Sequence, residues 1–271
     1  MTNERTKAGF DRLGPWVTRF LVDGAWYGGE YDFGSDPRVG LFLDLFPAAS
    51  RILELGSLEG GHTLALAAPP RVTRVVGVEA REGNVARARY ALSLLPSPKV
   101  EFVTGNLETM DLAPLGRFDA VFCSGLLYHL PRPWELLARL PAAAPDLFLW
   151  THYSGAADSA GTVWPGKVVG EFGLDDPLSG MSAGSFWPTL PALEGMLRQA
   201  GYGTLCRLRD EALHPQGPAI LLAATSRPLP PGERGAWISR SALTRLRSLA
   251  SRLRAAARRS RCSRSSRNAR R

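Results

Sequence analysis

The sequence predicts an α/β protein built on one mostly parallel sheet of seven strands with flanking helices. Short apolar runs alternate with segments of helical periodicity from residue 51 to about residue 225, which is the pattern of repeated β-then-α units. The first apolar run enters a glycine-rich turn directly, and two apolar runs at the end of this region predict two strands that close the sheet. This regular alternation favours one large domain over two small ones.

The first strand and its turn lie in residues 51–62, RILELGSLEGGH. Glycines at positions 56, 60 and 61 let the backbone turn tightly and approach a ligand closely. Glu54 is expected to point into the crevice at the end of this strand. A dinucleotide fingerprint needs G-x-G-x-x-G, but Leu58 occupies the middle glycine position and Glu59 would add negative charge where a pyrophosphate should lie. The turn therefore favours a cationic cofactor over a phosphate-rich one.

The second apolar strand, residues 72–78, ends on Glu79, which lies 25 residues beyond Glu54. A carboxylate at this position can accept hydrogen bonds from both hydroxyls of a ribose, as in adenosine-binding βαβ units. The alternative is an ordinary solvated glutamate at a strand end. Residues 84–95 then carry apolar side chains at helical spacing and stop before two prolines, which predicts a helix.

The remaining elements continue the alternation. A third strand, residues 99–103, leads to Asn106. The later elements are a fourth strand (118–123), a turn with Tyr128 and His129, a helix that begins near Pro131 and Pro133, a fifth strand (146–150), a helix (190–200) and two closing strands (203–208 and 218–224).

These landmarks, in this order, resemble the class I S-adenosylmethionine-dependent methyltransferases. The pattern Glu54-x-Gly56-x-x-x-Gly60 is similar to motif I of that family, whose sulfonium and amino-acid moiety lie over such a loop. The resemblance runs from about Arg51 to about Thr225 and implies a Rossmann-like fold that ends in an antiparallel hairpin, with S-adenosylmethionine as cofactor. Asn106 stands where the family usually has an aspartate that contacts the adenine amino group, and its amide can accept from that amine and donate to a ring nitrogen. The cofactor-binding residues that the resemblance implies are Glu54, Gly56, Ser57, Gly60, Glu79, Ala80, Asn106, Leu107, Cys123 and Ser124.

Three residues are candidates for the catalytic role. His152 follows the fifth strand, on the expected acceptor side, and imidazole titrates near neutral pH, so His152 is the first candidate for a general base. Its alternative role is a hydrogen bond to a neighbouring loop. His129 resembles the family's histidine that shapes the cofactor site, whereas Tyr128 either binds cofactor or substrate or lies in the core. His62 is expected in the first helical turn after the glycines.

No metal-ligand spacing occurs in the sequence. Asp146 and Asp158 do not supply the convergent carboxylates that a magnesium-dependent enzyme of this kind requires. The sequence therefore predicts metal-independent transfer.

Three segments flank or interrupt the core of the predicted methyltransferase domain, residues 51–225. Residues 1–50 form an N-terminal cap, whose aromatic-rich part, residues 10–38, is not expected to be a regular helix and would cover the cofactor as a lid. Residues 154–188 are a glycine-rich insertion directed toward the substrate. Residues 226–271 combine a proline-containing linker with an arginine-rich tail.

The basic charge of the chain belongs to this tail. Residues 226–271 contain 14 arginines and one acid and carry +13, whereas residues 1–225, with 19 basic and 24 acidic side chains, carry −5. Nucleic acid or an anionic membrane is therefore expected to bind only through the tail, in which a basic amphipathic helix over 243–257 precedes an arginine- and serine-rich disordered end. The alternative is an incidental extension. Three scattered cysteines and the lack of a long apolar segment predict a soluble cytoplasmic protein.

Together these features predict a methyltransferase that transfers a methyl group to a small-molecule acceptor at oxygen. The alternatives are a tRNA or RNA methyltransferase, favoured only by the tail, and a carboxymethyltransferase-like enzyme, favoured by Tyr128-His129 and residues 185–193. An NAD(P)-dependent oxidoreductase and a non-catalytic cofactor-binding protein also remain open. No oligomeric state follows from the sequence.

Overall fold

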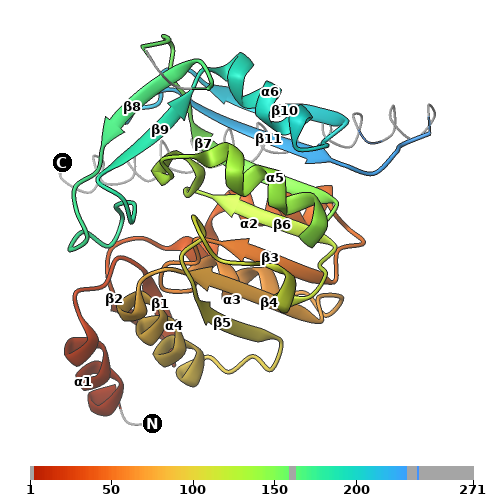
Figure 1. Cartoon of the computed structure of the whole chain (residues 1–271). Helices are drawn as coiled ribbons and strands as arrows, with labels where there is room; N and C mark the ends of the chain where they lie inside the picture. Colours follow the sequence, from red (N-terminus) through yellow and green to blue (C-terminus); the bar gives the residue numbers. More distant parts are fainter. Residues whose placement is uncertain (1–2, 159–162, 231–236, 238–271) are drawn as a thin grey trace, which may run out of the picture. The chain divides into compact units, whose positions relative to one another are not determined.

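The computed structural model describes residues 3–158, 163–230 and 237. The chain divides into two units, Met1–Pro228 and Leu229–Arg271, and the amphipathic helix predicted over 243–257 and the arginine-rich end lie outside the described residues. The centre of the first unit is a seven-stranded sheet in the order β10-β11-β7-β6-β3-β4-β5 (Figure 1). The strands are β3 (Arg51–Leu55), β4 (Arg74–Glu79), β5 (Val100–Thr104), β6 (Ala120–Ser124), β7 (Asp146–His152), β10 (Thr204–Glu211) and β11 (Ala219–Thr225).

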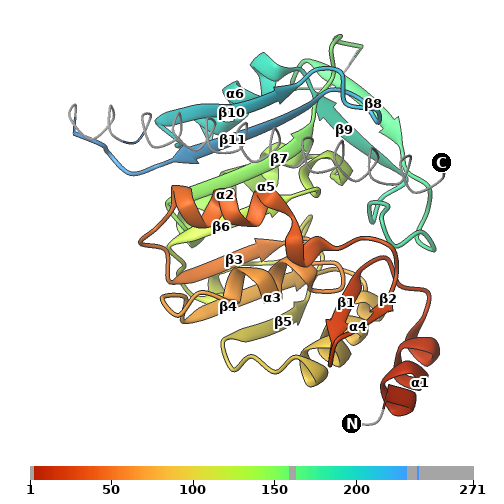
Figure 2. The same cartoon turned by 180° about the vertical axis from the view of Figure 1, so that it is seen from behind.

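Strands β3 to β7 run parallel, and β11 is antiparallel to both β7 and β10. This arrangement confirms the predicted Rossmann-like fold with its C-terminal antiparallel hairpin. Helices cover both faces of the sheet: α2 and α3 lie on one face, and α5 and α6 on the other (Figures 1 and 2). The helices are α1 (Asn3–Leu13), α2 (Pro37–Leu45), α3 (Gly61–Ala67), α4 (Glu82–Leu94), α5 (Pro133–Ala143) and α6 (Leu190–Gln199), with short 3-10 turns η1 (Phe33–Ser35), η2 (Ala113–Leu115) and η3 (Leu127–His129).

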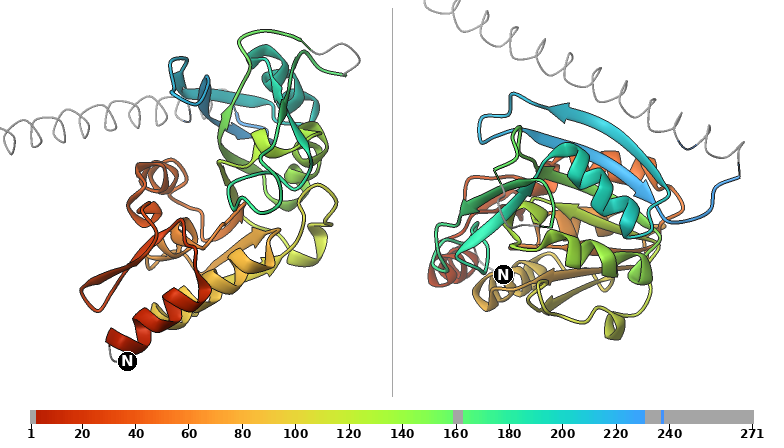
Figure 3. Two further views of the ribbon diagram at one scale, coloured as in Figure 1. Left: turned by 90° about the vertical axis from the view of Figure 1, so that its left-hand side faces the viewer. Right: turned by 45° about the horizontal axis from the view of Figure 1, so that its top comes forward.

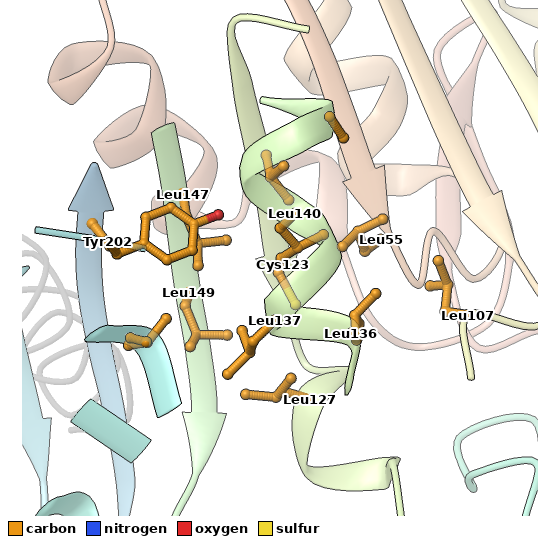
Figure 4. Packing of buried hydrophobic residues seen from close by; sticks show 14 of the residues in the cluster. Leu55, Leu107, Cys123, Leu127, Leu136, Leu137, Leu140, Leu147, Leu149 and Tyr202 are labelled. Atoms are coloured by element: carbon orange, nitrogen blue, oxygen red, sulfur yellow. The ribbon is translucent and has the colours of Figure 1, made fainter. Parts of the chain in front are cut away.

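The main core lies between the central strands and helices α5 and α6 (Figure 4). Leu136 and Leu137 of α5 lie four and three residues before Leu140, so they share its face of the helix, and all three are at most 1% exposed. Burying one such leucine contributes about 1.5–3 kcal/mol to folding. This packing fixes the parallel strands against one another and brings their carboxyl ends to one edge.

Strand β7 extends two residues beyond its predicted end. The antiparallel neighbour β11 pairs along its whole length, from Ala219 opposite His152 to Thr225 opposite Asp146. Thr151 and His152 are therefore held in the sheet by the ladder and do not belong to the loop that follows.

The insertion at residues 154–188 contains a hairpin that the sequence did not predict. Strands β8 (Gly166–Gly170) and β9 (Gly184–Pro188) pair antiparallel with each other. The sequence of β8, GKVVG, offers only two strand-forming residues between glycines, so its pattern is too short to indicate a strand. The connection between the two strands runs past the carboxyl ends of the parallel strands (Figure 1).

The N-terminal segment is more regular than expected. Helix α1 lies beside α4 (Figure 3), where Tyr90 Oη donates to Thr6 O at 3.0 Å. Strands β1 (Arg19–Val22) and β2 (Ala25–Gly28) form a hairpin through Asp23 and Gly24, both at positive φ. Residues 10–38 are not one regular helix, although α1 finishes and α2 begins at their two ends.

Glu59 ties this N-terminal segment to the glycine loop. Its carboxylate is 0% exposed and accepts hydrogen bonds from the backbone N–H groups of Val17 at 3.0 Å and Thr18 at 2.6 Å, with Arg87 Nε 3.8 Å away. Burial raises the pKa of Glu59, and these donors partly offset that rise. The expectation that Glu59 places its charge on the cofactor loop is therefore wrong, because the carboxylate is used to hold the cap.

Glu59→Gln is expected to lower the free energy of unfolding by about 1–3 kcal/mol, because the neutral amide loses the charge that strengthens both hydrogen bonds and sets an N–H donor against Val17 N and Arg87 Nε, where Oε1 now lies. Urea denaturation of wild type and variant measures the loss. Glu82→Gln is the control, since Glu82 is exposed in the first turn of α4. Equal midpoints for Glu59→Gln and wild type would contradict this role.

Candidate active site

The glycine loop between β3 and α3 has three residues in the left-handed region. They are Gly56 at φ +75°, Leu58 at φ +49° and Gly60 at φ +84°. Leu58 adopts this conformation at a cost of about 1–2 kcal/mol, so the loop keeps a glycine-like path where the sequence lacks the middle glycine. A Cβ on Gly60 would lie 2.5 Å from the Phe102 ring, which requires glycine there. The N–H groups of Gly56 and Ser57 donate to Val78 O at 2.9 and 3.0 Å.

Glu79 joins this loop to the turn after β4. Its Oε2 accepts from Leu58 N at 3.0 Å and its Oε1 accepts from Arg81 N at 2.9 Å. The side chain is 7% exposed, and burial raises its pKa despite these hydrogen bonds. Each carboxylate oxygen has a second lone pair, so Glu79 can accept from two further donors while it holds both turns.

Glu54 does not open into the crevice as expected but lies beneath α3. It is 1% exposed, its Oε2 accepts from Thr63 Oγ1 at 2.5 Å, and its Oε1 lies 3.6 Å from His62 Nδ1. His62 is in the first turn of α3, as predicted, and its Nε2 lies 3.0 Å from Asp36 Oδ2. Asp36 also pairs with Arg38. A chain of four charged groups therefore links β3 to the start of α2.

The two central groups of this chain have opposite pKa shifts. Burial alone would lower the pKa of His62, but hydrogen bonds to Asp36 and Glu54 raise it. Burial alone would raise the pKa of Asp36, but hydrogen bonds from His62 and Arg38 hold it far below its usual range. His62 and Asp36 therefore form an ion pair when both are charged.

This ion pair predicts a pH dependence of stability. Because the folded state raises the pKa of His62 above 6.5, protonation stabilises the fold below that value and the gain is lost as the pH rises through the folded pKa. We expect wild type to unfold at a higher temperature than His62→Gln at pH 6, with a difference that shrinks toward pH 9. Thermal melting of both proteins across this range measures it. A difference that grows with pH would contradict the assignment.

The ends of β5 and β6 contribute mainly main-chain atoms to the candidate site. Asn106 Oδ1 accepts from Glu108 N at 2.9 Å, and its side chain is partly exposed. The side chains of Leu107 and Cys123 instead lie in the apolar core, 4% and 0% exposed (Figure 4), and burial raises the pKa of Cys123 to about 12. From these two residues only main-chain atoms can face a ligand. Ser124 ends β6 at the crevice edge.

The connection between β8 and β9 covers the carboxyl ends of β4, β5 and β6. Arg81 donates to the carbonyl oxygens of Leu174 and Gly180 at 3.4 and 3.3 Å. Glu171 lies 3.0 Å from His129 Nδ1, and burial lowers the pKa of this histidine. The insertion therefore lies over the expected adenosine side of the crevice, and His129 anchors it.

His152 lies at the end of β7 within a cluster of rings. Its Nδ1 donates to Gly217 O at 3.0 Å, which places the ring proton on Nδ1 and leaves the lone pair on Nε2. The ring stacks on Trp187 at 4.9 Å between centroids and meets Tyr128 edge-on at 4.6 Å. His152 is 2% exposed, and burial lowers its pKa. Partly exposed rings surround it: Tyr128, Trp150, Trp187 and His214.

The structure thus brings two of the three predicted catalytic side chains together, His152 and Tyr128, and turns the third, His129, toward Glu171. Burial raises the pKa of Tyr128 to about 12, so its hydroxyl stays protonated and donates hydrogen bonds at neutral pH. Sequence reasoning missed the rest of the cluster. Trp150 had a usable signal, because residues two apart on a strand share a face. Trp187 belongs to the insertion at 154–188 that the sequence analysis directs toward the substrate, and the other residues that it missed are Asp36, Arg38, Glu211 and His214.

The residues at the loop fit a polar ligand. Ser57 Oγ and Ser124 Oγ are buried and accept or donate no hydrogen bond within the described part of the chain. Buried polar atoms are normally paired, so donors and acceptors of a bound S-adenosylmethionine would complete the set. Ser57 packs against Gly77 of β4, because a Cβ added to Gly77 would lie 2.9 Å from the Cβ of Ser57.

Two further findings concern metals and membranes. Across residues 3–158 and 163–230, no three His, Cys, Asp or Glu side chains gather as a metal ion would require. Over the same ranges, every helix is too short or too polar to cross a bilayer.

Comparison with known proteins agrees with this geometry. The methyltransferase domain family matches residues 53–141, and the chain belongs to the class I S-adenosylmethionine-dependent methyltransferases. It is similar to the N-terminal domain of EvdMO1, crystallised in the presence of S-adenosylhomocysteine and D-fucose, with 34% identity over 84% of this chain and 98% of that one and a TM-score of 0.76. A second structure of that domain has S-adenosylhomocysteine bound and a TM-score of 0.75.

The chain spans 48% of the longer EvdMO1 structure, to which it is 33% identical over 83% of its own length with a TM-score of 0.65. The YcgJ protein from Bacillus subtilis is 17% identical, over 71% of this chain and 99% of that one, with a TM-score of 0.50, and shares the fold alone. A search of curated proteins found no significant match. Membership of the family favours a methyl-transfer cofactor over the nicotinamide alternative.

Proposed function

We propose that this protein transfers a methyl group from S-adenosylmethionine to a hydroxyl oxygen of a small sugar-like molecule. The observation that carries the proposal is His152, whose Nδ1–H is committed to a backbone carbonyl and whose Nε2 lone pair lies among aromatic side chains. A base with a fixed tautomer suits a hydroxyl acceptor, which must lose a proton. The D-fucose present with the related EvdMO1 domain supports a sugar hydroxyl.

In this proposal residues 51–225 form the catalytic domain, residues 1–50 its cap, and residues 226–271 a separate tail. Glu79 accepts hydrogen bonds from the ribose, and Asn106 contacts the adenine from the end of β5. The backbone at Gly56, Ser57, Gly60, Ala80, Leu107, Cys123 and Ser124 lines the rest of the cofactor site, with Glu54 beneath the glycine loop.

When bound, S-adenosylmethionine supplies a methyl group whose bond to sulfur breaks as the acceptor oxygen forms a new bond to carbon. The electron pair of the broken bond stays on the sulfur, which becomes the neutral thioether of S-adenosylhomocysteine. The proton of the acceptor hydroxyl passes to His152 Nε2, and the Gly217 carbonyl, which accepts from Nδ1, stabilises the imidazolium. Trp187 and Tyr128 hold the acceptor in place and exclude water, which supplies much of the rate.

Incubation of the protein with S-adenosylmethionine and D-fucose, followed by mass spectrometry, tests the proposal. We expect S-adenosylhomocysteine and one monomethylated sugar in equal amounts. Other monosaccharides and a bulk tRNA sample form the comparison panel, and residues 1–228 are tested beside the full chain. Methylated tRNA without methylated sugar, lost on removing the tail, would overturn the sugar proposal in favour of nucleic-acid methylation.

A further inference from the structure

Arg38 is a cation at the edge of the aromatic cluster that the proposed reaction leaves without a role. It lies in the first turn of α2, and its side chain is 23% exposed. Its Nε donates to Asp36 Oδ1 at 3.0 Å and its Nη2 donates to Asp36 Oδ2 at 2.5 Å, so the guanidinium and the carboxylate form a bidentate pair, or fork. Its Cζ lies 4.7 Å from the ring centroid of Trp150. Of the described residues, none accepts a hydrogen bond from Nη1.

The groups behind Arg38 are buried and fix its position. The Asp36 side chain is 9% exposed and is held from the other side by His62 Nε2 at 3.0 Å. His62 in turn lies against Glu54 of β3, which is 1% exposed. A guanidinium set by a buried carboxylate loses little freedom when it binds another group. This degree of positioning exceeds what a surface cation–π contact requires.

We propose that Arg38 is an acceptor-binding residue whose Nη1 donates a hydrogen bond to an oxygen of a neutral, polyhydroxylated acceptor lying beside Trp150. The inference rests on the proposed function and adds the residue that selects the acceptor. Asp36 and His62 act as positioning residues for Arg38. The acceptor then lies between the guanidinium and His152, which is on the same strand as Trp150 and 5.1 Å from it between ring centroids.

The charges around Trp150 favour a neutral acceptor over an anionic one. Asp36 already compensates the charge of Arg38. On the opposite side Glu211 accepts from Trp150 Nε1 at 3.0 Å and is itself paired with Arg209. A carboxylate or phosphate on the acceptor would lie near the negative charges of Asp36 and Glu211, and the nearby arginines are already paired with these two residues. Such an anion would lose its hydration without gaining an ion pair.

The test is calorimetric titration of sugars into the full chain saturated with S-adenosylhomocysteine. D-Fucose is the neutral probe, and D-galacturonate, which has a carboxylate at C6 on the same ring, is the anionic one. Arg38→Gln removes both the positive charge and the bidentate pairing with Asp36. Arg38→Lys keeps the charge but not the bidentate pairing. Arg19→Gln is the matched control, because Arg19 Cζ also lies 4.5 Å from a tryptophan ring, that of the half-exposed Trp26 on the β1–β2 hairpin.

We expect Arg38→Gln to weaken D-fucose binding by about tenfold or more, with S-adenosylhomocysteine affinity within about twofold of wild type. Arg38→Lys should also weaken D-fucose binding, because a lysine cannot reproduce the fork, and Arg19→Gln should change neither affinity. D-Galacturonate should bind wild type more weakly than D-fucose. Arg38→Lys keeps the test valid if Arg38→Gln does not fold.

The outcomes separate this inference from the proposed reaction. If wild type binds D-fucose through Arg38 yet forms no methylated sugar with S-adenosylmethionine, the binding role stands and the proposed reaction fails. If both Arg38 variants bind D-fucose as wild type does, the role of Arg38 is overturned whether or not methylation occurs. Tighter binding of D-galacturonate, or no binding of D-fucose by wild type, overturns the neutral acceptor site.

Discussion

Glu79→Ala is expected to lower the affinity for S-adenosylhomocysteine by at least about 100-fold, the effect of losing two hydrogen bonds to a charged group. The substitution removes the acceptors for the ribose hydroxyls. It also frees the N–H groups of Leu58 and Arg81, which Glu79 holds at 3.0 and 2.9 Å. Because these donors belong to the two turns that flank the cofactor, the site loses both its contacts and its shape. Isothermal titration calorimetry measures the affinity directly.

The control for this experiment is Glu82→Ala, three residues further along the chain. Glu82 is exposed in the first turn of α4, so its removal changes the local charge without touching either turn. Glu79→Gln adds a finer test: its amide keeps one acceptor but sets an N–H donor against Leu58 or Arg81, so its affinity should lie between those of Glu79→Ala and wild type. Unchanged affinity in Glu79→Ala would show that the ribose lies elsewhere.

Much of the fold could be predicted because its signals are local. Each parallel strand is a short apolar run, and each glycine or proline that ends an element has a fixed conformational preference. The glycine loop and Glu79 belong to this class, since a residue at a strand's carboxyl end must lie at the ligand edge of a parallel sheet. Pairing with β11 was not local, which is why the end of β7 was predicted two residues short.

Side-chain direction was the main feature that the sequence could not supply. Glu54 and Glu59 were both expected at the cofactor, but the first lies under α3 beside His62 and the second holds the N-terminal segment. The partners that decide these directions lie on other elements: Thr63, which donates to Glu54, is 9 residues away across the glycine turn, and Thr18, which donates to Glu59, is 41 residues away. No periodicity relates such pairs, so only the folded structure shows them.

His152→Ala is expected to lower kcat by about 10²–10⁴-fold while leaving the affinity for S-adenosylhomocysteine unchanged. His152 lies at the end of β7, and its Nδ1 donates to the Gly217 carbonyl, so its Nε2 carries a lone pair that can accept a proton. His152→Gln is the matched variant, because its amide can still donate to Gly217 O but cannot take a proton at neutral pH. Both variants should lose turnover alike, which separates the proton transfer from the hydrogen bond that orients the ring.

The pH dependence of turnover then identifies the proton acceptor. Burial lowers the pKa of His152 below its usual 6.5, and a general base acts only in its neutral form, so kcat should rise with pH through a value below 6.5 and level off above it. The pKa of His62 is instead raised. If His62 were the base, the rise of kcat with pH would therefore occur above pH 6.5. We expect the residual kcat of His152→Gln to stay constant across the pH range, without the rise at low pH that wild type shows. A limb that persists in the variant, or turnover equal to wild type, would remove His152 from the reaction and leave it as a ring packed between Trp187 and Tyr128.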